Sequence, residues 1–187
     1  MKGRILTAAV VLMLLLPIAA SGQEKKNYVA LKTGLYTFKS DLREADFATG
    51  FDGEAVYGRY FHPNFVLEGG TGYFHDGVNK VFGNEVKGIP IILTAKGVYP
   101  LKGWELFAGG GVGVYFTQFH GSVHGNFADA SDTLFGGHFL TGANVDVSRS
   151  LFLGIEGKYI FTNTGDFKVI EANLNGYTVT VSLGFRF

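Results

Sequence analysis

Apolar and polar residues alternate with a period of two over long stretches of this chain, and this pattern constrains its fold more than any other feature. The alternation is clearest over residues 177–187, where odd-numbered positions are apolar or aromatic and even-numbered positions are Thr, Ser, Gly or Arg. Residues 151–161 repeat it, with Glu156 and Lys158 on the face opposite the apolar side chains. Successive side chains of a β-strand point to opposite faces, so this alternation is typical of strands with one apolar face. Because residues 23–187 contain no run with helical spacing, the sequence predicts an all-β domain.

The same template predicts eight strands of about 10 to 13 residues, the length at which a tilted strand crosses a bilayer. These strands are 28–38, 51–61, 65–74, 87–99, 105–116, 135–147, 151–161 and 176–187. Their connections alternate between short (62–64, 100–104, 148–150) and long (39–50, 75–86, 117–134, 162–175). Bacterial outer-membrane barrels have short periplasmic turns and longer external loops. We therefore expect an eight-stranded antiparallel up-and-down transmembrane β-barrel with both termini on the periplasmic side.

The first 22 residues have the layout of a secretory signal peptide. Lys2 and Arg4 precede an apolar run from Ala8 to Ala20, which is followed by Ser21 and Gly22. This run is short for a spanning helix and ends in small residues suited to cleavage. We expect residues 1–22 to be a cleaved signal peptide and residues 23–187 to form the barrel domain, the alternative being a membrane anchor helix.

Composition excludes several classes of protein. The chain has 16 Lys and Arg against 16 Asp and Glu, with no basic block, which argues against a nucleic acid partner. It contains no Cys, which excludes disulfide scaffolds, thiolate zinc sites, Cys nucleophiles and a lipoprotein anchor.

The charged residues indicate which face of each strand points inward. A Lys facing lipid near mid-depth costs about 2–4 kcal/mol, so the face without charges must be the lipid face. Strand 51–61 fits least well, because Arg59 shares the apolar face, and we expect Arg59 to lie near the rim and reach the headgroups. The predicted interior charge network consists of Lys32, Glu54, Glu68, Lys96, Glu105, Asp146, Glu156, Lys158 and Arg186.

This near-balance of interior charge predicts a network of ion pairs, since an unpaired buried charge is costly. Two roles remain open: structural filling of the barrel, and a selective ion path. The inward face is also rich in glycine. Those glycines either leave water pockets or make room for large side chains, namely Tyr36, Tyr60, Phe107 and Phe152.

Three segments resemble a known family. The terminal run Tyr177-Thr-Val-Thr-Val-Ser-Leu-Gly-Phe-Arg-Phe187 is similar to the last strand of bacterial outer-membrane barrels, which commonly end in Phe. Phe107-Ala-Gly-Gly-Gly-Val-Gly113 resembles the fifth strand of small porin-like barrels, and Gly58-Arg-Tyr-Phe-His-Pro-Asn64 resembles their second strand and turn. The chain thus resembles the outer-membrane β-barrel domain family of the OmpA/OmpX type.

In that family the last strand is recognised by the barrel assembly machinery, in keeping with strand pairing at a sheet edge. The resemblance assigns this role to Tyr177, Val179, Val181, Leu183, Phe185 and Phe187. The resemblance implies no catalytic residue and no cofactor.

Other candidate chemistry is sparse. Gly109–Gly113 lies within a predicted strand, whereas a nucleotide-binding loop opens a helix. His120 and His124 lack an evident third metal ligand, and Asp129 with Asp132 suggests at most a cation that bridges lipopolysaccharide phosphates. A lipid-modifying enzyme needs a nucleophile or base near the outer rim, and suitable residue types there are His120, Ser122, His124, Ser131, Asp132 and His138. These residues do not reproduce the His-x-Ser-Asn pattern of barrel lipid A deacylases.

We expect a non-enzymatic integral protein of the bacterial outer membrane with a structural or surface-interaction role. Its partners would be outer-membrane lipid and lipopolysaccharide, the assembly machinery during biogenesis, and an external ligand of the long loops. The alternative is a narrow passive porin-like channel. A lipid A-modifying barrel enzyme is a further alternative, as is a secreted lipocalin-like binder, although the latter would place its apolar face inside.

Overall fold

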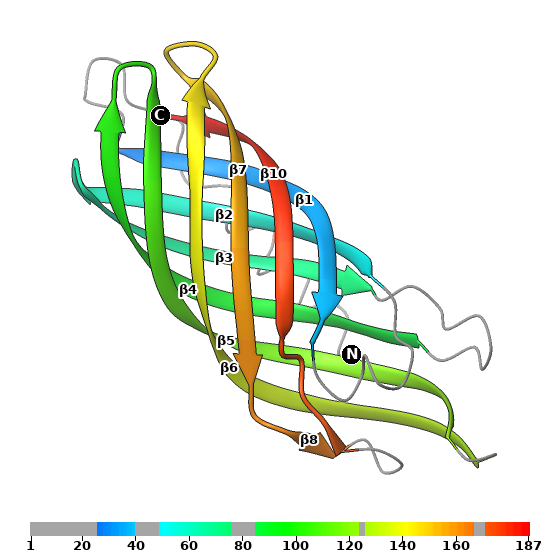
Figure 1. Ribbon diagram of the computed structural model, residues 1–187. Coiled ribbons are helices and arrows are strands. Elements are labelled where there is room, and N and C mark those ends of the chain that lie inside the picture. Colours follow the sequence, from blue (N-terminus) through cyan, green and yellow to red (C-terminus); the bar gives the residue numbers. More distant parts are fainter. Residues whose placement is uncertain (1–25, 40–48, 76–84, 124–125, 167–170) are drawn as a thin grey trace, which may run out of the picture.

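The computed structural model describes residues 26–39, 49–75, 85–123, 126–166 and 171–187, and these form a closed antiparallel β-barrel (Figure 1). No helix in this part of the chain is long and apolar enough to span a bilayer. The barrel strands follow one another around the ring in chain order. They are β1 (Asn27–Phe38), β2 (Gly50–His62), β3 (Phe65–His75), β4 (Glu85–Leu101), β5 (Trp104–Val123), β6 (Asn126–Asp146), β7 (Leu151–Thr162) and β10 (Gly176–Arg186).

The ring closes where the first and last strands pair. β1 and β10 are in register from Tyr28 opposite Arg186 to Phe38 opposite Gly176. The stagger of the barrel can be measured by following cross-strand partners from Leu35 on β1 in both directions around the ring. Through β2, β3, β4 and β5 the partners lead to Ser131 on β6, and through β10 and β7 they lead to Thr141 on β6. These two positions differ by 10 residues, and this stagger tilts the strands by about 35–45° from the barrel axis. The predicted eight-stranded transmembrane barrel is therefore confirmed.

The outer face has an aliphatic band between two aromatic belts, as expected for a membrane-spanning barrel. Exposed aliphatic side chains of the band include Leu31, Leu93, Val112, Ile155 and Val181. One belt, at the end with the long connections (the loop end), includes Phe51, Tyr73, Phe116, Phe161 and Tyr177. The other belt, at the end with the short connections (the turn end), includes Phe61, Phe65, Tyr99, Trp104 and Phe185.

Arg59 lies at the turn end of β2, as the sequence indicates. Its guanidinium carbon is 5.4 Å from the centre of the Phe61 ring. Arg59 therefore belongs to an aromatic belt and lies clear of the aliphatic band, where a cation would be costly.

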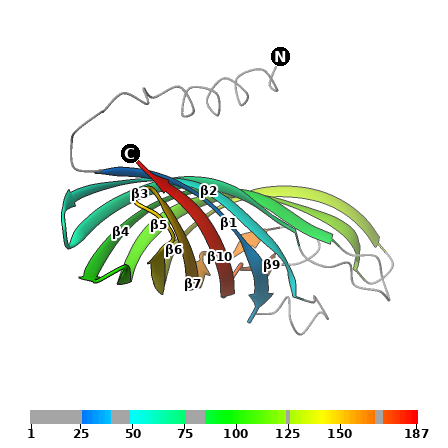
Figure 2. The ribbon, with the colours of Figure 1, turned by 90° about the horizontal axis from the view of Figure 1, so that it is seen from above.

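The long connection expected over 117–134 is a β-hairpin. Thr117–Val123 continue β5, Asn126–Leu134 continue β6, and the two segments pair throughout. β6 pairs with β7 only from Gly136 onward, so residues 126–134 pair with β5 alone. Figures 1 and 2 both show β5 and β6 continuing past the ends of the other strands. The glycines at Gly121 and Gly125 favour reading this segment as a loop, but pairing over the full length of both arms outweighs low local β-propensity.

The connection expected over 162–175 also contains local structure. A two-residue pair, β8 (Gly165–Asp166) and β9 (Glu171–Ala172), follows β7. At the turn end, Lys102–Gly103 joins β4 to β5, and Gly103 has a φ of 82°, which glycine adopts without strain.

Candidate functional site: the barrel interior

Four charged side chains form a closed ring inside the barrel. The Lys32 ammonium lies 2.9 Å from Glu68 Oε1 and 3.0 Å from Glu156 Oε2. The Lys96 ammonium lies 2.8 Å from Glu68 Oε2 and 3.0 Å from Glu156 Oε2. Each cation thus contacts both carboxylates, and all four side chains are at most 6% exposed. Alternating charge offsets much of the cost of removing these groups from water.

A second pair extends the ring toward the loop end. The Lys158 ammonium donates to Glu54 Oε1 and also lies 3.8 Å from Glu156 Oε1. Glu54 Oε2 is 4.0 Å from the Lys32 ammonium. These six residues form the central network, which consists of Lys32, Glu54, Glu68, Lys96, Glu156 and Lys158.

Strand register and alternation bring the central network together. Lys32 and Glu54 are direct cross-strand partners on β1 and β2, both on the inward face. Glu156 and Lys158 are two residues apart on β7, so their side chains share the same face. Lys96 and Glu68 lie diagonally opposite each other on the paired strands β4 and β3. The remaining contacts join strands that are not neighbours, and their partners follow from the stagger of the barrel.

Apolar clusters lie on both sides of the central network. Toward the loop end, one buried cluster comprises Tyr36, Phe38, Phe74, Val86, Ile92, Tyr115, Phe119, Ala130, Leu134, Ile160 and Leu174. Toward the turn end, the other comprises Tyr28, Ala30, Val56, Val66, Val98, Phe107, Leu140 and Phe152, with Tyr60 packed against it. The lumen is therefore filled in layers rather than open along its axis.

Interior glycines make room for several of these aromatic rings. A Cβ added at Gly184 would lie 2.0 Å from Phe152 Cζ, and one at Gly142 would lie 2.5 Å from Phe107 Cζ. Gly176 lies close to the ring of Tyr36 in the same way. The inward glycines were predicted either to leave water pockets or to make room for large side chains. At these positions they make room for large side chains.

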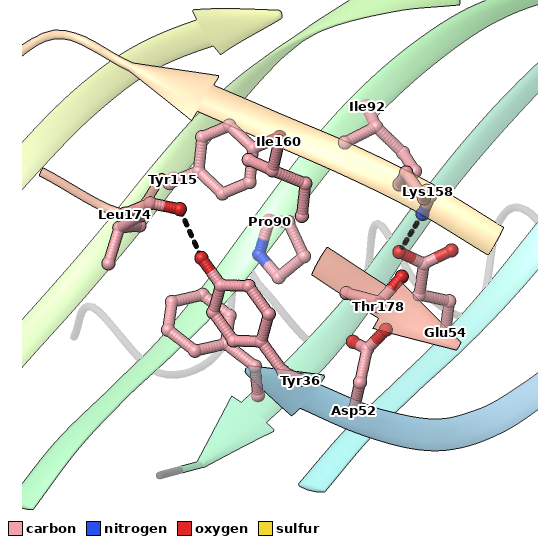
Figure 3. Close-up of a pocket in the computed structure, with 11 residues that line it drawn as sticks. Tyr36, Asp52, Glu54, Pro90, Ile92, Tyr115, Lys158, Ile160, Leu174 and Thr178 are labelled. Carbon is pink, nitrogen blue, oxygen red and sulfur yellow. Dashed lines mark hydrogen bonds and ion pairs between the residues drawn. The ribbon is translucent and has the colours of Figure 1, made fainter. Parts of the chain in front are cut away.

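One small cavity remains between the central network and the loop-end cluster. It measures about 10 Å³ as the space open to the centre of a water molecule, which is room for about one water. Figure 3 shows Asp52, Glu54, Thr178 and Lys158 in its wall, with the Lys158–Glu54 ion pair dashed. Asp52 Oδ2, Thr178 Oγ1 and the Tyr115 hydroxyl have no hydrogen-bond partner among the described residues. The cavity therefore has the size and the polar lining to hold a water molecule.

The other three predicted network residues form a separate cluster at the turn end. Arg186 Nη2 lies 3.1 Å from Glu105 Oε1, and Arg186 also pairs with Asp146. Tyr60 and Asn144 donate hydrogen bonds to Glu105 Oε1 at 2.9 and 2.7 Å. The side chain of Asp146 is 39% exposed, so unlike the central network it meets solvent.

Asp52, Tyr28 and His138 are among the interior polar residues that were missing from the predicted network. Asp52 is 4% exposed and adds one negative charge to the balanced central network. The Tyr28 hydroxyl donates to Glu68 Oε2 at 2.6 Å, and His138 Nε2 lies 2.8 Å from Thr94 Oγ1. Asp52 shares the parity of Glu54 along β2, and that signal in the sequence could have identified it.

The candidate metal and catalytic residues do not assemble within the described residues. In that part of the chain no group of three or more His, Cys, Asp or Glu side chains is placed to hold a metal ion. His138 points into the lumen, whereas Ser131 faces outward and is exposed. The side chains of His120, Ser122, His124 and Asp129 lie outside the described set, as does the expected signal peptide.

Five of the six residues of the predicted assembly signal lie on the outward face of the last strand, and Phe187 follows directly after it. From Tyr177 to Phe185 the odd-numbered side chains of β10 are exposed, while β10 is paired with β1 on one side and β7 on the other. The Phe187 N–H donates to the Asn27 carbonyl at 2.8 Å, which ties the last residue to the start of β1.

Comparison with known proteins identifies the family. The family model described as outer membrane protein beta-barrel domain matches residues 6–187. A search of curated protein sequences found no significant match.

Solved structures of other barrels share this fold at low sequence identity. Neisserial surface protein A is 15% identical with a TM-score of 0.58, and the match covers 86% of this chain and 95% of that chain. The N-terminal barrel domain of Pseudomonas aeruginosa OprF is 13% identical with a TM-score of 0.58, covering 88% of this chain and 100% of that chain. Ail, the attachment invasion locus protein of Yersinia pestis, is 12% identical with a TM-score of 0.57, covering 88% and 100%.

Proposed function

Because the chain belongs to the outer membrane protein beta-barrel domain family, we propose that it is an integral outer-membrane protein that presents a surface-interaction element on a closed, non-conducting barrel. The barrel is the anchor in this proposal, and the loop end faces outward from the cell. The role is structural or adhesive rather than enzymatic.

The observation that supports this proposal most directly is the projecting β5–β6 hairpin. Both arms continue beyond the last pairing of β6 with β7, at Gly136 opposite Thr162. An ordered hairpin presents a defined surface at low entropic cost to a partner, because its conformation is fixed before binding. A barrel that served only as an anchor would not need this extension.

A relative by fold provides a parallel for such a role. Ail, whose crystal structure in complex with the heparin analogue sucrose octasulfate is known, has 14% sequence identity to this chain. That barrel therefore forms a complex with a heparin analogue. In this chain we assign contact with external ligands to the β5–β6 hairpin and the neighbouring loops.

The interior supports a closed barrel over the alternative of a narrow channel. A conducting path would have to pass the apolar cluster at each end and the central network between them. Opening the network would leave buried charges without partners, which is strongly unfavourable. The filled layers therefore favour structural filling over ion transport.

The orientation can be tested with single cysteines, since the chain has none of its own. Ser131→Cys lies on the hairpin, and Lys102→Cys lies in the turn at the opposite end. In intact cells a membrane-impermeant maleimide should label the Ser131 variant and spare the Lys102 variant. Labelling of the Lys102 variant alone would overturn the proposed orientation.

The role of the hairpin can be tested by removing it. Phe119 and Ala130 are direct cross-strand partners and both belong to the loop-end cluster, so an Asn-Gly turn joining them would remove residues 120–129 and keep that cluster. We expect the trimmed barrel to fold, with the usual gel-mobility difference between unboiled and boiled samples, and to leave the outer membrane intact to dye entry. Cells should lose only their contacts with external surfaces. If the trimmed barrel does not fold, the hairpin is needed to stabilise the barrel itself.

Biogenesis completes the proposal. The signal peptide over residues 1–22 directs export, and N-terminal sequencing of the mature protein should begin between residues 21 and 23. The outward residues of β10, together with Phe187, serve as the signal for the assembly machinery. Phe187→Ala should lower the amount of folded barrel in cells, while the purified variant still refolds in detergent.

A further inference from the structure

The outward side chains of β4, β5 and β6 change character in regular steps toward the loop end. Cross-strand partners define rows, and the first row is apolar and contains Ile91, Val114 and Phe135. The next row contains Ile89, Phe116 and Thr133, at the level of the aromatic belt, and so mixes apolar and polar side chains. The row after that is entirely polar and consists of Lys87, Gln118 and Ser131. This succession of apolar, mixed and polar rows matches the passage from acyl chains to headgroups in a bilayer.

A groove of about 520 Å³ lies on this outer surface, across the aromatic and polar rows. Tyr73, Ile89 and Phe116 line its part nearer the aliphatic band. Lys87, Gln118 and Ser131 line the part farther from it. The groove thus has an apolar base and a polar upper wall with a cation.

We propose that this groove binds the phosphate-bearing headgroup of an outer-leaflet lipid. The proposal rests on the orientation given under the proposed function, because that orientation places the polar row in the outer leaflet. The Lys87 ammonium binds the phosphate, Gln118 and Ser131 hydrogen-bond to headgroup hydroxyls, and the apolar base packs against the first carbons of the acyl chains.

Position and charge both identify a lipid as the occupant. The groove is continuous with the lipid-facing band, so membrane lipid is the molecule that lies against it. The cation points to an anionic headgroup, since a charge-assisted hydrogen bond to phosphate is stronger than a neutral one. Asp132 also lines the groove, but by strand alternation its side chain lies on the opposite face of β6, where its Oδ1 accepts a hydrogen bond from the N–H of Thr133 at 2.7 Å.

Lipid retention in nanodiscs tests the proposal. Full-length mature barrel would be refolded into phosphatidylcholine nanodiscs with a minor fraction of bisphosphorylated lipid A, and retained lipid would be counted by native mass spectrometry. Lys87→Ala should lower retention of lipid A about tenfold, whereas Lys87→Arg should preserve it. Lys102→Ala, which removes an exposed lysine from the opposite rim, is the matched control and should retain lipid A like the unmodified protein.

Two further arms identify the ligand. Dephosphorylated lipid A should be retained as weakly by the unmodified protein as bisphosphorylated lipid A is by Lys87→Ala. Inorganic phosphate in solution should not displace lipid A; displacement would mean that free phosphate is the ligand. Equal retention by Lys87→Ala and Lys102→Ala, with correct cysteine labelling, would refute the groove and leave the proposed function standing.

Discussion

Lys32 and Glu156 lie on strands that are not neighbours, yet the Lys32 ammonium is 3.0 Å from Glu156 Oε2. β10 lies between β1 and β7 in the ring, so this contact bridges an intervening strand across the lumen. Lys96 contacts the same carboxylate oxygen at 3.0 Å from β4. A single carboxylate therefore joins strands that are far apart in the ring.

Removing that carboxylate charge should destabilise the barrel strongly. In Glu156→Gln, Lys32 and Lys96 each lose a carboxylate partner, and breaking a buried pair costs about 3–5 kcal/mol. Urea unfolding in phosphatidylcholine vesicles, followed by the fluorescence of Trp104, the single tryptophan, measures the loss. Asp146→Asn is the matched control, since its half-exposed pair with Arg186 should contribute less than about 1 kcal/mol. Equal losses in the two variants would show that the central network is solvated.

Neutralising Asp52 should raise the free energy of unfolding, in contrast to neutralising Glu156. Its carboxylate is buried beside a balanced set of charges, and Oδ2 has no hydrogen-bond partner among the described residues. In Asp52→Asn the excess charge disappears and the amide can donate to Glu54 Oε2 or the Tyr115 hydroxyl, so the free energy of unfolding should rise by about 1 kcal/mol. The same urea titration applies, and a loss as large as that of Glu156→Gln would show that the carboxylate of Asp52 is well paired.

The contact between Gly184 and Phe152 should be sensitive to a single methyl group. A Cβ at position 184 would overlap the Phe152 ring, so Gly184→Ala should destabilise the barrel by about 1–3 kcal/mol. Gly157→Ala is the control, because a Cβ there meets no atom within 4 Å. Combining Gly184→Ala with Phe152→Leu should recover part of the loss; no recovery would mean that the clash lies elsewhere.

The aliphatic band predicts where a new cation is tolerated. Leu93→Arg places a charge on the outward face within the band and should cost about 2–4 kcal/mol. Leu101→Arg, beside the Lys102–Gly103 turn, should cost about 0–1 kcal/mol because the side chain reaches the interface. Similar costs at both positions would contradict the assignment of the band to the bilayer core.

The strand pattern and the inward face were predictable from the sequence because both depend on local alternation. Charges at Glu156 and Lys158 identify the inward face of β7 without knowledge of its neighbours. The same reasoning places Arg59 near a rim, where it lies. These features are properties of one strand at a time.

Partnerships across the lumen were not predictable in the same way. The choice of Glu156 as the partner of Lys32 depends on the stagger of ten residues, which no local pattern encodes. The β5–β6 extension was missed because pairing between its two arms, rather than the propensity of either, makes it a hairpin. The contact of Gly184 with Phe152 likewise requires the register of β10 against β7.

Single-channel recording of the refolded mature barrel in a planar bilayer tests the central claim of a closed interior most directly. Folding would be verified beforehand by the difference in gel mobility between unboiled and boiled samples. The layered interior predicts no discrete current steps from the folded protein. It also predicts that Glu156→Gln, which weakens the central network, is the variant most prone to show them. Reproducible steps from the unmodified, demonstrably folded barrel would contradict the account and establish the channel instead.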